Sequence, residues 1–174
     1  EAGKGPVLGS MFAAAVVANP AALPDDVDDS KAVPAARRPG LASEIREAAA
    51  AVAVAEVPVE CIDHPETDMN SLTVVAHAEA LAAATRGEDP EQVRPEDQVP
   101  EDSGVEATRV DGSPPDGPVA GTVDAGDTDA ERFGRRVAER LAVDVDLTAE
   151  HGADETDQLV GAASVVAKQA REAH

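Results

Sequence analysis

The sequence has 174 residues, the length of one ordinary domain, and its 35 acidic and 14 basic residues give a formal net charge of -21. This charge excludes the broad basic surface typical of nucleic-acid-binding proteins, so a bound polyanion would need metal ions or a few directed cationic contacts. Roughly 1 M salt shortens the Debye length to about 3 Å and screens the self-repulsion, so we interpret the acidity as an adaptation to strong salt.

Strand and helix patterns alternate in the first third of the chain. The apolar run at residues 9–18 predicts a buried strand that ends in a turn. Residues 34–51 favour a helix, which Pro39 and Gly40 interrupt. The Val-rich residues 52–59 then predict a second strand.

A long helix and an acidic insertion come next. Residues 69–85 carry apolar side chains at helical spacing, which predicts a helix with one apolar face. Residues 86–118 are a low-complexity stretch rich in Pro, Gly, Asp, Glu and Ser. We interpret this stretch as an insertion outside the core, because such a charge run is more typical of a solvated loop than of an interaction motif.

The last third of the chain repeats the alternation. Residues 119–123 and 143–148 predict strands, and residues 159–173 predict a helix. Thr128 and Glu131 have the spacing of a capping box, which predicts that another helix starts there. Because strands alternate with helices throughout, the sequence indicates an α/β fold.

Three carboxylates, Glu1, Asp124 and Asp154, fall at the predicted ends of strands or in the loops just beyond them. Open α/β sheets bind their ligands at such edges. Converging carboxylates repel one another unless a divalent cation neutralises them, and hard oxygen ligands favour Mg²⁺ or Mn²⁺. With 35 acidic residues in the chain, a solvated surface role is the alternative for each of the three.

Lysine is scarce: the chain contains only Lys4, Lys31 and Lys168. On so acidic a surface these ammonium groups are the places to expect an anionic ligand, and phosphate is the first candidate. Gly3 and Gly5 flank Lys4, and without a Cβ they would let the backbone approach a ligand closely. A plain tight turn is the alternative for this pair of glycines.

Several other classes of site are not supported. The four histidines lack paired metal-ligand spacing and no serine has the nucleophile-elbow pattern, so we expect surface or structural roles for the histidines. The apolar residues 11–18 are too few to span a bilayer. Cys61 is the only cysteine, so no disulfide can form within the chain, and we expect a buried thiol in a cytoplasmic protein. We also expect a monomer.

A series of short motifs resembles, in order and spacing, the type 2 ribonuclease H family, also called ribonuclease HII. The archaeal branch is the most similar, and the acidity points to a halophilic archaeon. The resemblance covers the chain outside residues 86–118. The motifs are Glu1-Ala-Gly-Lys-Gly-Pro-Val-Leu-Gly-Ser-Met, Asp29-Ser-Lys, Met69-Asn-Ser-Leu, Val123-Asp-Ala-Gly-Asp, Glu150-His-Gly-Ala-Asp and Gly161-Ala-Ala-Ser-Val-Val-Ala-Lys168.

The resemblance implies one ribonuclease H-like domain over residues 1–174, with a mixed sheet flanked by helices and an insertion at 86–118. It implies an endonuclease that cleaves the RNA strand of RNA/DNA hybrids, and duplex DNA at embedded ribonucleotides, with two Mg²⁺ or Mn²⁺ ions. Glu1, Asp124 and Asp154 match the metal-binding acids. The residues matched to the substrate, through its 2′-hydroxyl or its phosphates, are Gly3, Lys4, Gly5, Ser30, Lys31, Ser164 and Lys168.

The chain also departs from the family pattern. The family's first acid stands immediately before Glu1, so we expect the leading Asp, its central strand and the C-terminal helices to be missing from this chain. Gly152 stands where many relatives have Lys. We therefore expect the chain alone to fold poorly and to cleave little. The alternative function is that of an inactive fragment or degenerate paralogue that binds hybrid weakly without cleavage.

Overall fold

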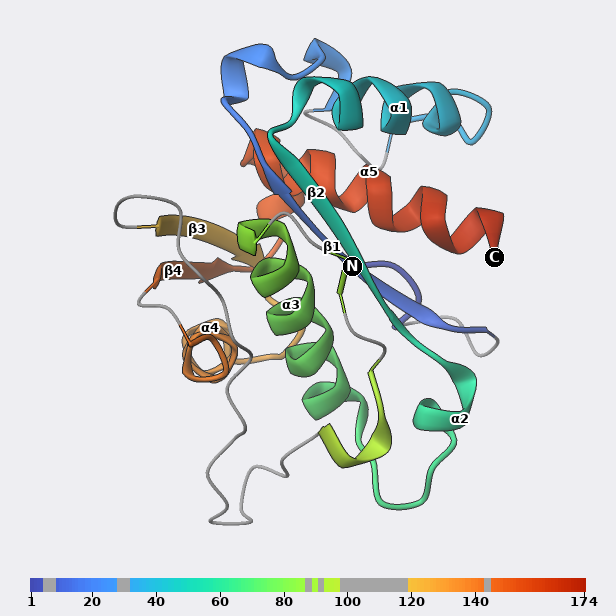
Figure 1. The fold of residues 1–174 in the computed structure, drawn as a ribbon, viewed down its shortest axis with the longest axis vertical. Helices are drawn as coiled ribbons and strands as arrows, with labels where there is room; N and C mark the ends of the chain where they lie inside the picture. Colours follow the sequence, from blue (N-terminus) through green and yellow to red (C-terminus); the bar gives the residue numbers. More distant parts are fainter. Residues whose placement is uncertain (5–8, 28–31, 87–88, 91–92, 98–118, 143–144) are drawn as a thin grey trace.

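The computed structural model describes residues 1–4, 9–27, 32–86, 89–90, 93–97, 119–142 and 145–174. Strands and helices alternate along this part of the chain (Figure 1), which confirms the α/β class. The strands are β1 (Met11–Val17), β2 (Ala51–Val57), β3 (Val119–Asp124) and β4 (Val145–Glu150). The helices are α1 (Arg38–Ala48), α2 (Val59–Ile62), α3 (Met69–Arg86), α4 (Ala130–Glu139) and α5 (Gln158–Ala173).

The strands pair in two separate sheets within the described part of the chain. β1 and β2 are antiparallel, with Met11 opposite Val57 and Val17 opposite Ala51. β3 and β4 are parallel, with Asp124 opposite Glu150. β1 and β3 are not paired with each other, and residues of both line a cavity of about 190 Å³. The described strands thus form two small sheets instead of the single mixed sheet that the resemblance implies, and strands of both sheets line the cavity.

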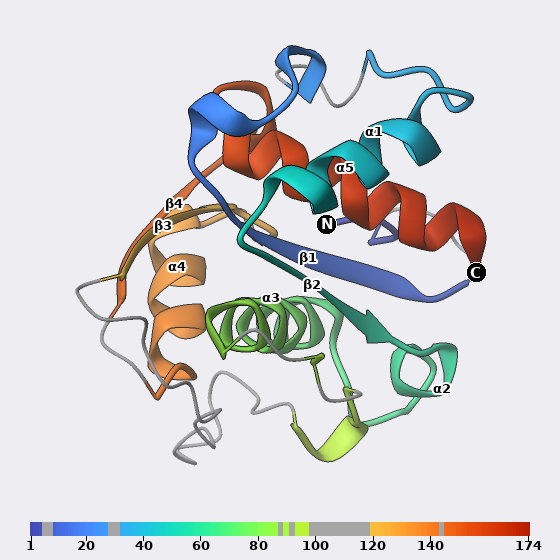
Figure 2. The same cartoon turned by 45° about the horizontal axis from the view of Figure 1, so that its top comes forward.

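Helices cover the sheets on both sides. The β1–β2 sheet lies between α3 on one face and α5 on the other, and α1 packs on the outside of α5 (Figures 1 and 2). α4 covers β4 and also contacts α3. This arrangement leaves the cavity between the sheets bordered by α3 and α5.

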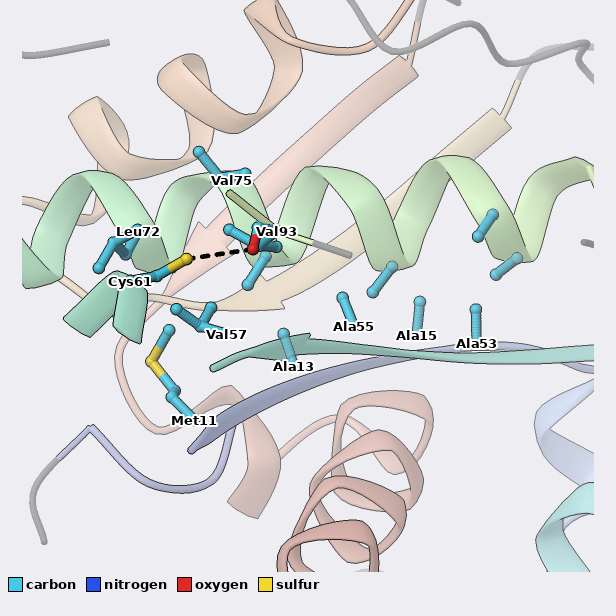
Figure 3. Packing of buried hydrophobic residues seen from close by; sticks show 14 residues of the cluster. Met11, Ala13, Ala15, Ala53, Ala55, Val57, Cys61, Leu72, Val75 and Val93 are labelled. Carbon is cyan, nitrogen blue, oxygen red and sulfur yellow. Dashed lines mark hydrogen bonds between the residues drawn. The ribbon is translucent and has the colours of Figure 1, made fainter. Parts of the chain in front are cut away.

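Small side chains let the helix and the sheet come close. Met11, Ala13 and Ala15 of β1 face α3 together with alternate residues of β2, and all of them are nearly inaccessible to solvent (Figure 3). On the other side of the molecule, a Cβ at Gly134 of α4 would lie 2.8 Å from the Cβ of Ala149. The chain has two Phe and no Tyr or Trp, so close backbone approach replaces large side chains in this core.

Helix α3 is buried on more than one side, so the prediction of a single apolar face is wrong. Leu72 and Val75 pack against the β1–β2 sheet. Val74 and Ala78 pack with Phe133 of α4 in a second cluster. The sequence does not reveal this second buried face, because alanine, which suits both buried and exposed positions, fills much of the helix.

Two helix starts differ from the predictions. Pro39 and Gly40 do not split a helix but stand in the first turn of α1, where the missing N–H of proline costs no hydrogen bond. The sequence favours a helix cap at Thr128 and Asp129, and the cap of α4 is Asp129: its side chain accepts a hydrogen bond from the backbone N–H of Arg132 at 2.9 Å. The capping position is therefore one residue later than the spacing of Thr128 and Glu131 indicates.

Part of the predicted insertion belongs to the core. Arg86 ends α3, and Val93 is only 1% exposed. The buried thiol of Cys61 donates to the carbonyl of Val93 at 3.2 Å, and Nη2 of Arg140 donates to the carbonyl of Asp97 at 2.5 Å. The segment is thus fastened to the core at two points, while residues 98–118 lie outside the described part of the chain.

Replacing Gly134 by Ala should destabilise the protein. The new methyl group would press on Ala149, and overpacking outweighs the gain in helix propensity, so we expect a loss of about 1–2 kcal/mol in the free energy of unfolding. Denaturant unfolding in molar KCl measures this. The control is Gly40→Ala, whose methyl group would meet only the flexible tip of Arg37 at 3.2 Å. Equal effects of the two substitutions would contradict the close packing of α4 on β4.

Candidate active site

The cavity between the two sheets brings the three candidate carboxylates together on one lining. Residues 14–17 of β1, Ala18 just after it and residues 120–124 of β3 line the cavity, as do Glu1 and Asp154. β3 and β4 are parallel, so their carboxyl ends lie at the same edge of the sheet. Asp124 ends the first of these strands, and Asp154 follows the second, which explains why residues 30 positions apart in the sequence border one cavity.

Asp124 is oriented by the turn that follows β4. Its Oδ1 accepts hydrogen bonds from the backbone N–H groups of Gly152 at 2.9 Å and Ala153 at 3.3 Å. Gly152 has a φ of 70°, in the left-handed region, and no atom lies within 4 Å of a Cβ built there. The turn thus fixes one carboxylate oxygen of Asp124 and ties the ends of the two strands together.

Asp154 lies in the 3₁₀ turn Ala153–Glu155 and is 5% exposed. Its Oδ2 accepts a hydrogen bond from the hydroxyl of Ser164 at 3.4 Å. Ser164 is itself buried on α5, so its hydroxyl is directed at a carboxylate. The sequence predicts a substrate contact for Ser164; in the structure Ser164 lines the cavity and its hydroxyl contacts Asp154.

Glu1 contributes an oxygen that lacks a neutralising partner. Its Oε2 is buried, with no hydrogen-bond partner among the described residues. A buried carboxylate oxygen without a donor is costly, and a hard cation would relieve that cost. In the described part of the chain, no three Asp, Glu, His or Cys side chains come close enough to form a complete metal site. The carboxylates therefore fit a divalent cation in chemistry but supply only part of its coordination shell.

The amino-terminal segment reaches the same region. Gly3 has a φ of 113°, and a Cβ there would lie 2.8 Å from the carbonyl oxygen of Ser10, so only glycine fits. Lys4 donates to Oδ1 of Asn70 at 2.9 Å and also to the carbonyl of Gly126. Because Gly126 is two residues beyond Asp124, Lys4 lies over the loop that follows the carboxylate.

The remaining predicted substrate residues are placed less closely or not at all. Lys168 is half-buried on α5, one helical turn beyond Ser164, and is not among the described residues that line the cavity. Gly5, Ser30 and Lys31 lie outside the described part of the chain. In the structure Glu1, Asp124, Asp154 and Ser164 thus line one cavity, and Lys4 contacts the loop that follows Asp124.

A buried histidine also borders the cavity. His77 hydrogen-bonds through Nδ1 to the carbonyl of Thr73 at 2.8 Å, and its ring meets Phe133 edge-on with the ring centroids 5.2 Å apart. Burial is the main cause that lowers the pKa of His77 to about 3. His77 is thus buried within the helix packing, which agrees with a structural role. Its place beside the candidate site could not be predicted from the sequence, because it depends on which face of α3 meets the cavity.

Comparison with known proteins decides the family. The sequence profile described as Ribonuclease HII matches residues 1–104. The chain belongs to the ribonuclease HII family. It is 57% identical to ribonuclease HII of Haloarcula marismortui and 53% identical to that of Halobacterium salinarum, in each case over the whole chain and 68% of the relative.

Solved structures of the family share the fold. The structure of a PCNA:RNase HII complex from Archaeoglobus fulgidus matches 99% of this chain and 70% of that chain, with a TM-score of 0.71 and 29% identity. Ribonuclease H2 from Pyrococcus horikoshii matches the same shares with a TM-score of 0.70 and 27% identity. The fold is thus ribonuclease H-like, and the chain belongs to a family of ribonuclease H endonucleases. No described helix is long and apolar enough to cross a membrane.

The burial of His77 should make stability depend on pH. Its pKa is about 3 in the folded state and about 6.5 in an unfolded chain, so between these values the unfolded state binds the extra proton. Stability therefore falls as the pH falls, and from pH 7 to pH 5 the contribution of His77 amounts to about 2 kcal/mol. Denaturant unfolding at both pH values in molar KCl measures it.

The matched variants are His77→Gln, which removes the buried imidazole, and His151→Gln, which removes an exposed one. His77→Gln should lose about 2 kcal/mol of the difference between pH 7 and pH 5, even if the variant is less stable throughout. His151→Gln should keep the dependence of the unmodified protein. The same dependence in both variants would show that His77 is not buried as described.

Proposed function

We propose that this protein hydrolyses the RNA strand of RNA/DNA hybrids, and duplex DNA at an embedded ribonucleotide, with the help of divalent cations. The observation that carries the proposal is the cavity between the two sheets, which Glu1, Asp124 and Asp154 all line. Membership of the ribonuclease HII family gives this site its reaction class.

Glu1, Asp124 and Asp154 would hold the cations, and their oxygen ligands suit Mg²⁺ or Mn²⁺. Bound in pairs, such cations activate an attacking water and stabilise the charge that develops on the phosphate and the leaving oxygen. The buried, unpartnered Oε2 of Glu1 supports a cation at this place. Water or substrate phosphate would complete the coordination that the described side chains leave open.

The chain's own groups would keep the carboxylates in position. Two backbone N–H groups hold Oδ1 of Asp124, and the hydroxyl of Ser164 donates to Asp154. A carboxylate held by neutral donors keeps its charge while losing rotational freedom, which favours metal binding over solvation. We therefore propose that Ser164 positions Asp154 and does not itself bind phosphate.

Recognition of RNA would depend on the glycine-flanked lysine segment. We propose that Gly3, Lys4 and Gly5 contact the 2′-hydroxyl, largely through backbone groups, which distinguishes RNA from DNA at the cleaved linkage. The absence of space for a Cβ at Gly3 supports close backbone packing in this segment.

Phosphate contacts and the state of the protein complete the proposal. We propose that Ser30, Lys31 and Lys168 contact substrate phosphates, and that residues 1–174 form one domain, in which the segment at 86–118 packs on the core through Val93 and Asp97. We further propose a cytoplasmic monomer. The single cysteine, Cys61, is buried and burial raises the pKa of its thiol, which suits an unreactive thiol in a reducing compartment.

Cleavage of a duplex with one ribonucleotide tests this function. The full-length product of the gene, in molar KCl with Mg²⁺ or Mn²⁺, should nick that duplex and spare an all-DNA duplex of the same sequence. Asp124→Asn and Asp154→Asn should each lower kcat by at least about 100-fold, because the lost charge weakens the cation site. A gel assay of initial rates measures both results.

Asp146→Asn is the matched control, since it makes the same charge change at an exposed position of β4. It should retain the unmodified rate within about twofold. Full activity of the Asp124 and Asp154 variants would show that the wrong acids were assigned. Failure of the unmodified protein to nick the ribonucleotide duplex would refute the function itself.

A further inference from the structure

Several arginines in the described part of the chain lie within ion-pair distance of a carboxylate, among them Arg37, Arg38, Arg94 and Arg132. Two other cations, Lys4 and Arg136, contact only neutral oxygens within the described residues. Arg46 and Arg140 likewise donate to carbonyl oxygens. Lys4 and Arg136 are set apart by their place, because both contact the first turn of α3.

Lys4 and Arg136 come from distant parts of the sequence and meet at adjacent residues. Nζ of Lys4 donates to Oδ1 of Asn70 at 2.9 Å, and Nη2 of Arg136 donates to the hydroxyl of Ser71 at 2.8 Å. Asn70 is exposed, whereas Ser71 is buried, so the Ser71 hydroxyl holds the guanidinium of Arg136 from its buried side. A guanidinium has five N–H donors, so one bond to Ser71 leaves others for a ligand.

Lys4 connects this pair of cations to the loop that follows Asp124. Lys4 also donates to the carbonyl of Gly126, two residues beyond Asp124. Two acids of neighbouring segments have other partners: Asp127 is paired with Arg132 at 2.5 Å, and Asp68 accepts the backbone N–H of Ser71 at 2.8 Å. Within the described residues, the hydrogen-bond partners of Lys4 and Arg136 are thus all neutral, and Lys4 lies beside the loop that follows Asp124.

We infer that Lys4, Asn70 and Arg136 form a phosphate-binding surface that holds the sugar–phosphate backbone of the nucleic-acid substrate beside the cleavage site. The inference rests on the proposed function. In strong salt the long-range attraction of cations for nucleic acid is screened, so affinity must come from direct contacts. An arginine held by a neutral hydroxyl provides such a contact, because its planar fork can donate two hydrogen bonds to one phosphate.

Binding of an all-DNA duplex tests this surface without requiring cleavage, since phosphate contacts do not depend on a 2′-hydroxyl. The dissociation constant is measured by fluorescence anisotropy with the full-length protein, across the KCl range in which circular dichroism shows it to be folded. Arg136→Gln should raise the dissociation constant about tenfold and lower the slope of log Kd against log salt by about one. Arg136→Lys, which keeps the charge, should remain within about threefold of the unmodified protein.

Arg135→Gln is the matched control, because it removes the same charge from the adjacent, exposed residue of α4. It should change the dissociation constant by less than about twofold. In the cleavage assay with a ribonucleotide duplex, Arg136→Gln should raise KM and leave kcat within about twofold, as expected for a binding contact outside the reacting atoms.

Equal dissociation constants and salt slopes for Arg136→Gln and Arg135→Gln would overturn the phosphate-binding surface, and cleavage by the unmodified protein would then still support the proposed function. Conversely, a protein that binds duplex with the expected difference between the two variants, but never nicks a ribonucleotide duplex, would support the surface and refute the proposed function.

Discussion

The candidate site depends on the two hydrogen bonds that run from the turn after β4 to the carboxylate of Asp124. The donors are the backbone N–H groups of Gly152 and Ala153. They join the carboxyl ends of two parallel strands and hold Asp124 beside the turn that carries Asp154. Together with the pairing of β3 and β4, they hold Asp124 near Asp154 against the mutual repulsion of two like charges.

The scaffold that holds this turn is built from small residues. Alanines of β1 and β2 let α3 lie close to the sheet, and Gly134 lets α4 lie close to Ala149 of β4. Such a core gains little hydrophobic free energy per residue. A net charge of -21 adds repulsion among the acidic side chains at low ionic strength. Strong salt and cations bound at the site would both weaken this repulsion and so stabilise the folded state. The relatives in Haloarcula and Halobacterium agree with that interpretation.

Much of the fold could be predicted from the sequence. Each predicted strand corresponds to an observed one within two residues, because Val-rich runs bounded by turn residues have few alternatives. The errors arose where local patterns are ambiguous. The alanines of α3 do not show which sides are buried, and Val93 lies in an acidic, proline-rich stretch whose composition hides a core contact.

The site was predictable in its acids but not in its supporting contacts. The positions of Asp124 and Asp154 follow from where the strands end, and the family motifs singled them out among 35 acidic residues. The bond from Ser164 to Asp154 and the contact of Arg136 with Ser71 could not be predicted, since both join helices or turns whose relative placement only packing decides. Ser71 and Ser164 are also uncharged, so no pattern of opposite charges in the sequence indicates that they contact Arg136 and Asp154.

Direct measurement of Mn²⁺ binding, by electron paramagnetic resonance on the full-length protein without substrate, tests the central claim that these carboxylates form a cation site. The account predicts saturable binding that Asp124→Asn weakens at least about tenfold and that Asp146→Asn leaves unchanged. Of these two residues, Asp124 lines the cavity and Asp146 does not. Equal binding by the unmodified protein and both variants would contradict it.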